Sequence, residues 1–189
     1  MQKDDSYQLV KECLKGKRDA QRNLYKSFAP SMLAVCFRYT KNMDDAENIL
    51  QDGFVKVFNN LHQYKGEGEL GAWVRRIMVN TSLTYLKTNR KYQHDMLFEE
   101  TPLHRVSSDD PEVALNAKEL SELIRQLPTG FQTVFNLHAV EGYSHVEIGT
   151  MLGISDGTSR SQYFRARALL IEWMEKISLK EKRGQYGRK

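Results

Sequence analysis

The residues with the clearest chemistry lie between 155 and 172, where basic, hydroxyl and aromatic side chains recur at helical spacing. At about 100° per residue, one arc of a helix there carries Arg160, Ser161, Phe164 and Arg165. Guanidinium groups bind guanine edges or phosphates, a hydroxyl group donates or accepts hydrogen bonds, and an apolar face contacts thymine methyl groups. This arc therefore predicts a surface that reads the major groove of DNA. The alternative is a solvated charged face with no ligand.

Two short helices joined by a tight turn must position that arc. Ser144 and Glu147 form the two ends of a capping box, which predicts a helix that begins there and ends near Leu152. Gly153 can take the left-handed conformation needed just past a helix end, and Ser155 then caps the next helix. The inner arc of that helix, expected to pack on the domain, carries Ser159, Tyr163, Ala166 and Leu170. The pattern predicts a helix-turn-helix.

The first half of the chain holds a second region with binding chemistry. Residues 44–60 are expected to form an acidic, partly apolar helix, which suits a protein partner. Residues 69–89 are expected to form a helix that mixes basic, aromatic and amide side chains, including Trp73, Arg76 and Asn80. That mixture suits unpaired DNA, because phosphates need cations and bases need stacking or edge contacts. On spacing alone, Trp73 fits a core position better than a stacking platform.

Apolar periodicity at helical spacing predicts an all-α protein. In the first half it predicts four helices, over 4–15, 19–39, 44–60 and 69–89. Pro30 is expected to kink or divide the second helix, and Asp44 with Asp45 to start the third by capping and by their charge at its N-terminus. Three glycines between 64 and 71 predict a loop.

Around 94–112 the helical pattern fails, because six acids, one arginine and two prolines follow one another there. We expect a largely extended, mobile linker. Asp110 and Pro111 then open a helix that stops at Pro128; its apolar stripe is Val113, Ala117, Leu120, Ile124 and Leu127. A helix over about 130–140 should end at Gly142 and carry on one face Phe131, Val134, Phe135 and His138. That histidine fits the edge of a core better than a ligand position.

The composition narrows the classes of function. A formal net charge of +4 and a pI near 9.0 are weak support for a polyanionic partner. Cys13 and Cys36 lie in helical patterns without a Cys or His cluster at ligand spacing, so we expect buried thiols, no metal and no cofactor. The polar, acidic start is no signal peptide, and apolar runs of about six residues fall short of the roughly 20 that span a membrane. We therefore expect a soluble, cytoplasmic protein without membrane insertion.

Five stretches resemble the extracytoplasmic-function sigma factors, group IV of the sigma-70 family of RNA polymerase sigma factors. They cover about 7–175 in the family's order and read DAENILQDGFVKVF, AWVRRIMVNTSLTYL, LP, EGYSHVEIGTMLGIS and GTSRSQYFRARALL. The resemblance implies two small helical domains, a region 2 bundle over 1–92 and a region 4 helix-turn-helix over 112–178. It also implies a flexible acidic linker over 93–111, and a basic tail follows over 179–189.

The resemblance further implies three binding surfaces and their partners. The −35 promoter element would be read by Thr158, Arg160, Ser161, Phe164 and Arg165. The unwound −10 strand, with a flipped base, would be bound by Tyr64, Lys65, Trp73, Arg76 and Asn80. The clamp helices of the polymerase β′ subunit would contact Asp45, Glu47, Gln51, Asp52, Val55 and Phe58. The β subunit of core polymerase and an anti-sigma factor are further expected partners.

Two positions depart from the family pattern. Gly149 stands where alanine is usual and costs about 0.5–1 kcal/mol in a helix interior. Ser159 stands where a branched apolar residue is common. Both are expected to loosen the second domain without touching the reading face.

Two other functions stay open. A dimeric helix-turn-helix regulator would bind DNA without core polymerase, but it would need a dimer interface and a sensor domain. A nuclease would use His145 and Glu147, although both are better explained as residues that open a helix. The sequence contains no Gly-rich phosphate loop or nucleophile motif, so we expect a protein that is not an enzyme.

Overall fold

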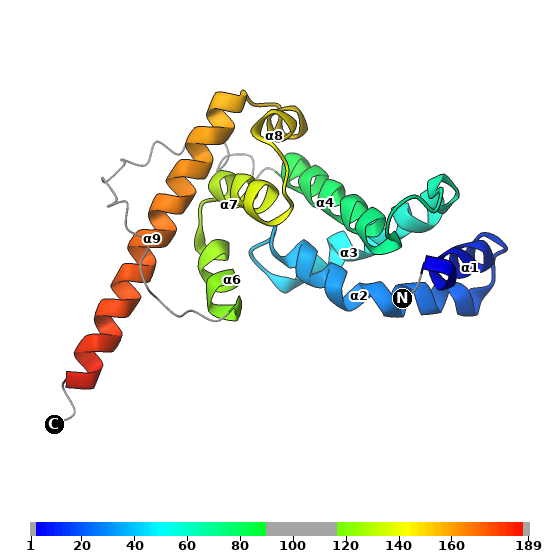
Figure 1. Ribbon diagram of the computed structural model, residues 1–189, viewed down its shortest axis with the longest axis horizontal. Coiled ribbons are helices and arrows are strands. Elements are labelled where there is room, and N and C mark those ends of the chain that lie inside the picture. The colour runs from blue at the N-terminus through cyan, green and yellow to red at the C-terminus, as the bar shows by residue number, and fades with distance from the viewer. Residues whose placement is uncertain (1–2, 90–116, 187–189) are drawn as a thin grey trace. The chain divides into compact units, whose positions relative to one another are not determined.

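The structure, a computed structural model, describes residues 3–89 and 117–186. The chain forms two compact units, Met1–Asn89 and Arg90–Lys189. Every regular element within the described residues is a helix, which confirms the all-α prediction (Figure 1). The expected linker over 93–111 lies outside the described residues.

The first unit consists of four long helices and one 3-10 turn. In chain order these are α1 (Lys3–Leu14), α2 (Arg18–Phe37), α3 (Met43–Asn60), η1 (Leu61–Gln63) and α4 (Leu70–Thr88). Helices α2, α3 and α4 pack on one another around buried side chains such as Leu24, Val57 and Met78. Gly53 lets α3 and α4 approach closely, because a Cβ there would collide with the Met78 side chain. All four helices lie where the periodicity predicts them.

One local expectation in this unit is wrong, and for Pro30 the structure excludes one of the two expected effects. Asn42, rather than an aspartate, caps α3: its Oδ1 accepts from the Asp45 amide at 2.8 Å, and its Nδ2 donates to Asp45 Oδ2 at 2.9 Å. Asp44 and Asp45 lie in the first turn, where their charge still suits the helix N-terminus. Pro30 lies inside one continuous helix and does not divide it. Apolar side chains on both sides of Pro30 bury α2 in the unit: Leu24, Ala29, Met32 and Val35.

The second unit contains shorter helices followed by one long helix. These are α6 (Ala117–Gln126), α7 (Thr129–Phe135), the π-helix η2 (Asn136–Val140), α8 (His145–Leu152) and α9 (Asp156–Tyr186). The predicted helix over 130–140 is thus α7 continued by η2. Helix α9 extends into the expected basic tail. Around one core the unit packs Leu123, Ile124, Leu127, Phe131, Ala166 and Leu170.

One residue of the predicted α6 stripe is misplaced. Leu120 is exposed and Leu123 is buried, because α6 meets the core through its C-terminal half. Val113 and the predicted Asp110–Pro111 start lie outside the described residues.

Both cysteines are free and buried, as predicted. In Cys36, burial raises the thiol pKa to about 11, against a weaker opposing effect of a hydrogen bond with Ser82. No helix within the described residues is long and apolar enough to cross a membrane.

Candidate nucleic-acid and protein interfaces

A helix-turn-helix forms in the second unit, as the capping signals predict. At the start of α8, Ser144 Oγ accepts from the Glu147 amide at 3.3 Å, and Glu147 Oε2 accepts from the Ser144 amide at 2.8 Å. Gly153 follows α8 in the left-handed conformation, with φ of +74°. Ser155 Oγ then accepts from the Thr158 amide at 2.9 Å at the start of α9. These bonds satisfy amides that helix ends leave unpaired, so they define the turn between α8 and α9.

Gly149 fits the close approach of this turn to α8, a role that the expectation of a loosened domain did not include. Its carbonyl accepts from the amides of Gly153 at 2.8 Å and Ile154 at 3.0 Å. A Cβ added at Gly149 would lie 2.8 Å from the Ile154 carbonyl oxygen and 3.5 Å from the Asp156 amide nitrogen. The backbone of the turn can approach α8 this closely because residue 149 has no side chain.

The outer arc of α9 carries three of the predicted DNA-reading residues on the surface. Arg160 and Ser161 are exposed, and Phe164 is 63% exposed. Arg160 Nη2 lies 3.5 Å from Asp156 Oδ2 in an exposed ion pair, which contributes little to stability. Ser161 Oγ donates to the Thr158 carbonyl at 2.9 Å, so its lone pairs face solvent as acceptors.

Thr158 and Arg165 are placed differently from these three. Thr158 is exposed, but its Oγ1 lies 2.8 Å from Ser155 Oγ, so it also belongs to the helix cap. Arg165 is half-buried and takes part in an interaction within the protein. It lies about 100° around the helix from Phe164, on the flank of the outer arc rather than at its centre.

The inner arc of α9 packs on the domain as predicted, but it also makes a polar contact with α8 that the sequence analysis did not predict. Ser159, Ala166 and Leu170 are buried, and Tyr163 is half-buried. Ser159 Oγ lies 2.9 Å from His145 Nδ1 on α8, a hydrogen bond between residues 14 positions apart. Ser159 therefore joins the two helices, a role that the sequence analysis did not foresee. No local pattern could have revealed a bond between residues so far apart in sequence.

His145 also belongs to a cluster of rings. It stacks on His138 with ring centroids 4.2 Å apart, and the Tyr163 ring meets His138 edge-on at 4.6 Å. His138 Nδ1 lies 2.8 Å from the Tyr143 carbonyl oxygen, which only accepts, so Nδ1 carries the proton. His138 thus occupies the predicted edge-of-core position. Burial lowers the pKa of His145, and the nearby His138 and Arg160 lower it further.

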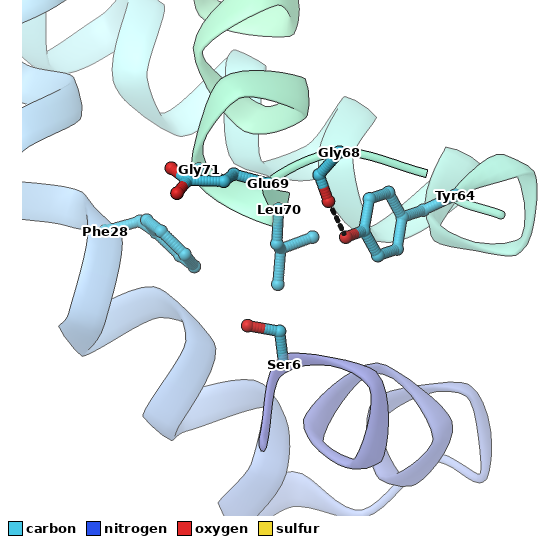
Figure 2. A pocket seen from close by; sticks show the side chains of 7 residues that line it. All are labelled: Ser6, Phe28, Tyr64, Gly68, Glu69, Leu70 and Gly71. Atoms are coloured by element: carbon cyan, nitrogen blue, oxygen red, sulfur yellow. Dashed lines mark hydrogen bonds between the residues drawn. The ribbon is translucent and has the colours of Figure 1, made fainter. Parts of the chain in front are cut away.

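In the first unit, the loop before α4 borders a pocket of about 400 Å³. Figure 2 shows its lining: Ser6, Phe28, Tyr64, Gly68, Glu69, Leu70 and Gly71. Tyr64 Oη donates to the Gly68 carbonyl at 2.9 Å, and the half-buried Trp73 packs 5.7 Å from the Tyr64 ring. Tyr64 is 9% exposed, so it shapes the loop and offers a ligand almost no ring surface. Lys65, on the same loop, is exposed.

One face of α4 is an exposed polar stripe. Arg76, Asn80 and Thr84 recur every four residues and are all exposed. At about 1.5 Å per residue the stripe is about 12 Å long, and Asn80 lies about 15 Å along α4 from Leu70 in the pocket wall. Asn80 and the pocket therefore cannot contact the same nucleotide base.

Helix α3 presents an exposed face of mixed character. Glu47, Gln51 and Asp52 are exposed, and Val55 is 58% exposed among them. This face offers carboxylates around an apolar centre, as expected for a protein partner.

Phe58 and Asp45, also predicted for this face, make contacts within the unit. Phe58 is half-buried, and its ring centroid lies 6.2 Å from that of Phe54. Asp45 is half-buried and accepts a hydrogen bond from Asn42. Burial raises the pKa of the Tyr85 phenol, and a hydrogen bond between Tyr85 and Asp45 raises it further. Both residues support α3 from inside the unit.

A groove of about 440 Å³ runs beside the α3 face, between α2 and α3. Its α2 wall carries residues the sequence analysis did not assign to any surface: Tyr25, Ala29, Pro30 and Leu33. Glu47 and Gln51 form part of the α3 wall. A groove between two helices depends on tertiary packing, so the pattern of either helix alone does not reveal it.

Within the described ranges, no three His, Cys, Asp or Glu side chains are grouped as metal ligands would be. The stacked pair His138 and His145 has one ring nitrogen of each residue already bonded within the protein.

Both units are helical and the second contains a helix-turn-helix, so the chain has the architecture of a helical DNA-binding protein. Comparison with known proteins agrees with this class for both units. The models of Sigma-70 region 2 and Sigma-70, region 4 match residues 24–92 and 117–170. The RNA polymerase sigma factor YlaC of Bacillus subtilis (strain 168) is 30% identical over 169 residues, 87% of this chain and 98% of that protein. The ECF RNA polymerase sigma-E factor of Haemophilus influenzae is 28% identical over 173 residues, 86% of this chain and 91% of that one.

A solved structure shares the fold. The sigma factor RpoE from Bartonella quintana, in complex with the anti-sigma factor NepR, has a TM-score of 0.50 and 22% identity, covering 82% of this chain and 96% of that one. The chain belongs to the extracytoplasmic-function group of the sigma-70 family, and it is an alternative sigma factor for transcription initiation.

Proposed function

We propose that this sigma factor joins core RNA polymerase through α3, holds the unwound −10 strand along α4 and reads the −35 element with α9. In this scheme, residues 1–92 bind polymerase and the −10 element, 112–178 bind the −35 element, and 93–111 link them. The basic tail follows over 179–189, and α9 reaches into it as far as Tyr186. The sigma factor itself catalyses no reaction, because the polymerase forms the phosphodiester bonds. It acts in the cytoplasm, where core polymerase is.

The exposed face of α3 and the groove beside it form the polymerase-binding surface. The partner is the pair of β′ clamp helices, and a groove between α2 and α3 is a shape that accepts a helix. Val55 supplies an apolar centre, surrounded by Glu47, Gln51 and Asp52. Asp45 and Phe58 hold the surface in place from inside the unit.

The stripe on α4 follows the unwound −10 strand. Arg76 binds phosphate, while Asn80 offers a donor and an acceptor from one amide to a base edge. The pocket between Phe28 and Leu70 takes an extruded base at the other end of the path, and Lys65 contributes a phosphate contact there. Tyr64 and Trp73 position the loop rather than stack on DNA.

The outer arc of α9 lies in the major groove at the −35 element. Arg160 and Ser161 contact base edges, and Phe164 contacts thymine methyl groups. Thr158 lies at the helix N-terminus, where backbone phosphates bind. Arg165 supports the contact from the flank of the arc.

The β subunit and an anti-sigma factor complete the set of partners. The linker is acidic and threads toward the interior of the polymerase, alongside the β subunit. The sigma factor RpoE was solved in complex with the anti-sigma factor NepR, and we extend a partner of that kind to this chain.

One observation carries the proposal: one chain combines an acidic and apolar helix face, an exposed Arg76–Asn80 stripe and a helix-turn-helix reading arc. Run-off transcription with purified core polymerase on genomic fragments identifies a promoter. Gel shift on that promoter should then show a specific complex only when core polymerase is present. Specific binding to the duplex by a dimer without polymerase would overturn the proposal in favour of a conventional regulator.

Variants on α9 then separate its reading face from the rest of the helix. Arg160→Ala should weaken binding at the −35 element by about 1–3 kcal/mol if the contact is bidentate to a base, with polymerase binding intact. Lys176→Ala is the matched control. Lys176 is also an exposed cation on α9, but it lies about 24 Å along the helix from Arg160 and pairs with Glu172.

A further inference from the structure

We propose that His145 and Ser159 are positioning residues for −35 recognition: their hydrogen bond, enclosed by His138 and Tyr163, sets the rotation of α9 on α8, and this packed arrangement is disfavoured when His145 takes up a proton. This inference rests on the proposed function of α9 as the reading helix. It assigns a role to a ring cluster that neither the reading face nor the hydrophobic core explains.

The first argument is the burial of a polar group between the two helices. Ser159 has no exposed surface, and its Oγ lies 2.9 Å from His145 Nδ1. A buried hydroxyl group without a partner is strongly destabilising, so this bond favours the one rotation of α9 that brings the two atoms together. Apolar neighbours such as Ala166 and Leu170 pack well over a wider range of rotations, because hydrophobic contact has no preferred direction.

The second argument is the position of the bond relative to the reading face. Ser159 and Arg160 are consecutive residues of one rigid helix, pointing about 100° apart. Any rotation of α9 that breaks the bond at Ser159 turns Arg160 and Phe164 through the same angle. A contact between a guanidinium group and a base edge depends on that angle, so the buried bond and the reading face are mechanically coupled.

The third argument is the enclosure of His145. His138 comes from η2 and stacks on His145 at 4.2 Å, and Tyr163 comes from α9 and packs against both imidazoles, at 4.6 Å and 5.8 Å. The Tyr143 carbonyl holds His138 in turn, at 2.8 Å from Nδ1. Rings from η2, α8 and α9 therefore pack together and fix the position of α9 relative to η2 and α8.

Protonation opposes this arrangement. The titratable and charged groups around His145 are His138 from η2 and Arg160, Asp156 and Tyr163 from α9. Burial, His138 and Arg160 all disfavour a charged His145, and Asp156 opposes them, so the pKa lies below its ordinary 6.5. The loosened state therefore binds protons more tightly than the packed state. The contribution to stability is complete above pH 6.5 and is lost as the pH falls below that value.

The test uses the full chain with core polymerase. Open complexes are quantified on a promoter and on the same promoter with its −35 element replaced, between about pH 5.5 and pH 8. The amount of open complex on the intact promoter, divided by the amount on the altered promoter, measures −35 discrimination. Effects of pH on the polymerase cancel in this ratio because they act on both promoters. The wild-type ratio should fall toward the acid end, because the loosened state takes up the proton more readily than the packed state.

Three variants separate positioning from simple packing. His145→Gln keeps an amide that can bond Ser159 but cannot titrate, so its ratio should stay close to the wild-type neutral value at every pH. Ser159→Ala should lower the ratio about fivefold even at neutral pH. His62→Gln, which changes an exposed histidine of the first unit, is the matched control and should keep the wild-type profile.

A flat wild-type profile, or Ser159→Ala with normal discrimination, would overturn the proposal. If Arg160→Ala leaves discrimination unchanged, the reading face is misassigned, and the proposed function fails separately. In that case the hydrogen bond between His145 and Ser159 is tested without DNA. The unfolding midpoint of the second unit is measured as a function of pH. Below pH 6.5, wild type should lose stability relative to His145→Gln. Parallel pH curves for the two proteins would overturn the proposal.

Discussion

Gly149→Ala should destabilise the helix-turn-helix, although alanine is the better helix former. In an unobstructed helix interior this change stabilises by about 0.5–1 kcal/mol. Here the added methyl group would lie 2.8 Å from the Ile154 carbonyl oxygen, a backbone atom that cannot move without displacing the turn. Inserting a methyl group into a tightly packed position costs about 1–3 kcal/mol. The net expectation is a loss of about 1 kcal/mol, with about 2.5 kcal/mol as the upper bound.

Tryptophan fluorescence can follow the second unit alone. The chain has two tryptophans, Trp73 in the first unit and Trp173 against the second core. In a Trp73→Phe background, urea denaturation monitored by fluorescence therefore gives the free energy of unfolding around Trp173. The comparison is made between Gly149→Ala and the parent protein in that background.

Gly157→Ala is the matched control, because its Cβ would meet nothing closer than Ser155 Oγ at 3.7 Å. It should be neutral or stabilise by up to about 1 kcal/mol. The close-approach argument is refuted if Gly149→Ala proves as stable as the parent while Gly157→Ala behaves as expected.

Three further predictions concern the first unit. Asn80→Ala should leave closed complexes intact and impair opening, because it removes a base-edge amide from the exposed α4 stripe; unchanged permanganate reactivity of −10 thymines on duplex promoter would contradict this. Val55→Arg should weaken binding to core polymerase at least about tenfold without lowering the melting temperature, because Val55 is 58% exposed; normal affinity in a fluorescence titration would remove it from the interface. Cys36 should react with a disulfide reagent far more slowly in the native protein than in urea at pH 8, because burial raises its pKa to about 11; equal rates would show that the thiol is accessible.

The sequence by itself determined both ends of α8, the start of α9 and therefore the helix-turn-helix. Ser144, Glu147, Gly153 and Ser155 act on amides within four residues of themselves, so their effect can be read from a short window. Helical periodicity likewise separated α9 into an inner and an outer arc, because the number of residues between two positions fixes the angle between their side chains around a regular helix. For the same reason the exposed residues of α3 and α4 follow from their spacing once the buried stripe is known.

Tertiary structure decided the roles of residues whose environment comes from elsewhere in the chain. Gly149 and Ser159 look like weak points in a helix, yet one admits the turn backbone and the other bonds a histidine 14 residues away. Tyr64 and Asp45 carry groups suited to ligands, but Tyr64 is buried beside the Trp73 ring of α4, and Asp45 bonds Tyr85 of the same helix. In each case the side chain's chemistry was known beforehand. Which partner it met depended on how helices and turns pack on one another, and the side chain's own type does not reveal that packing.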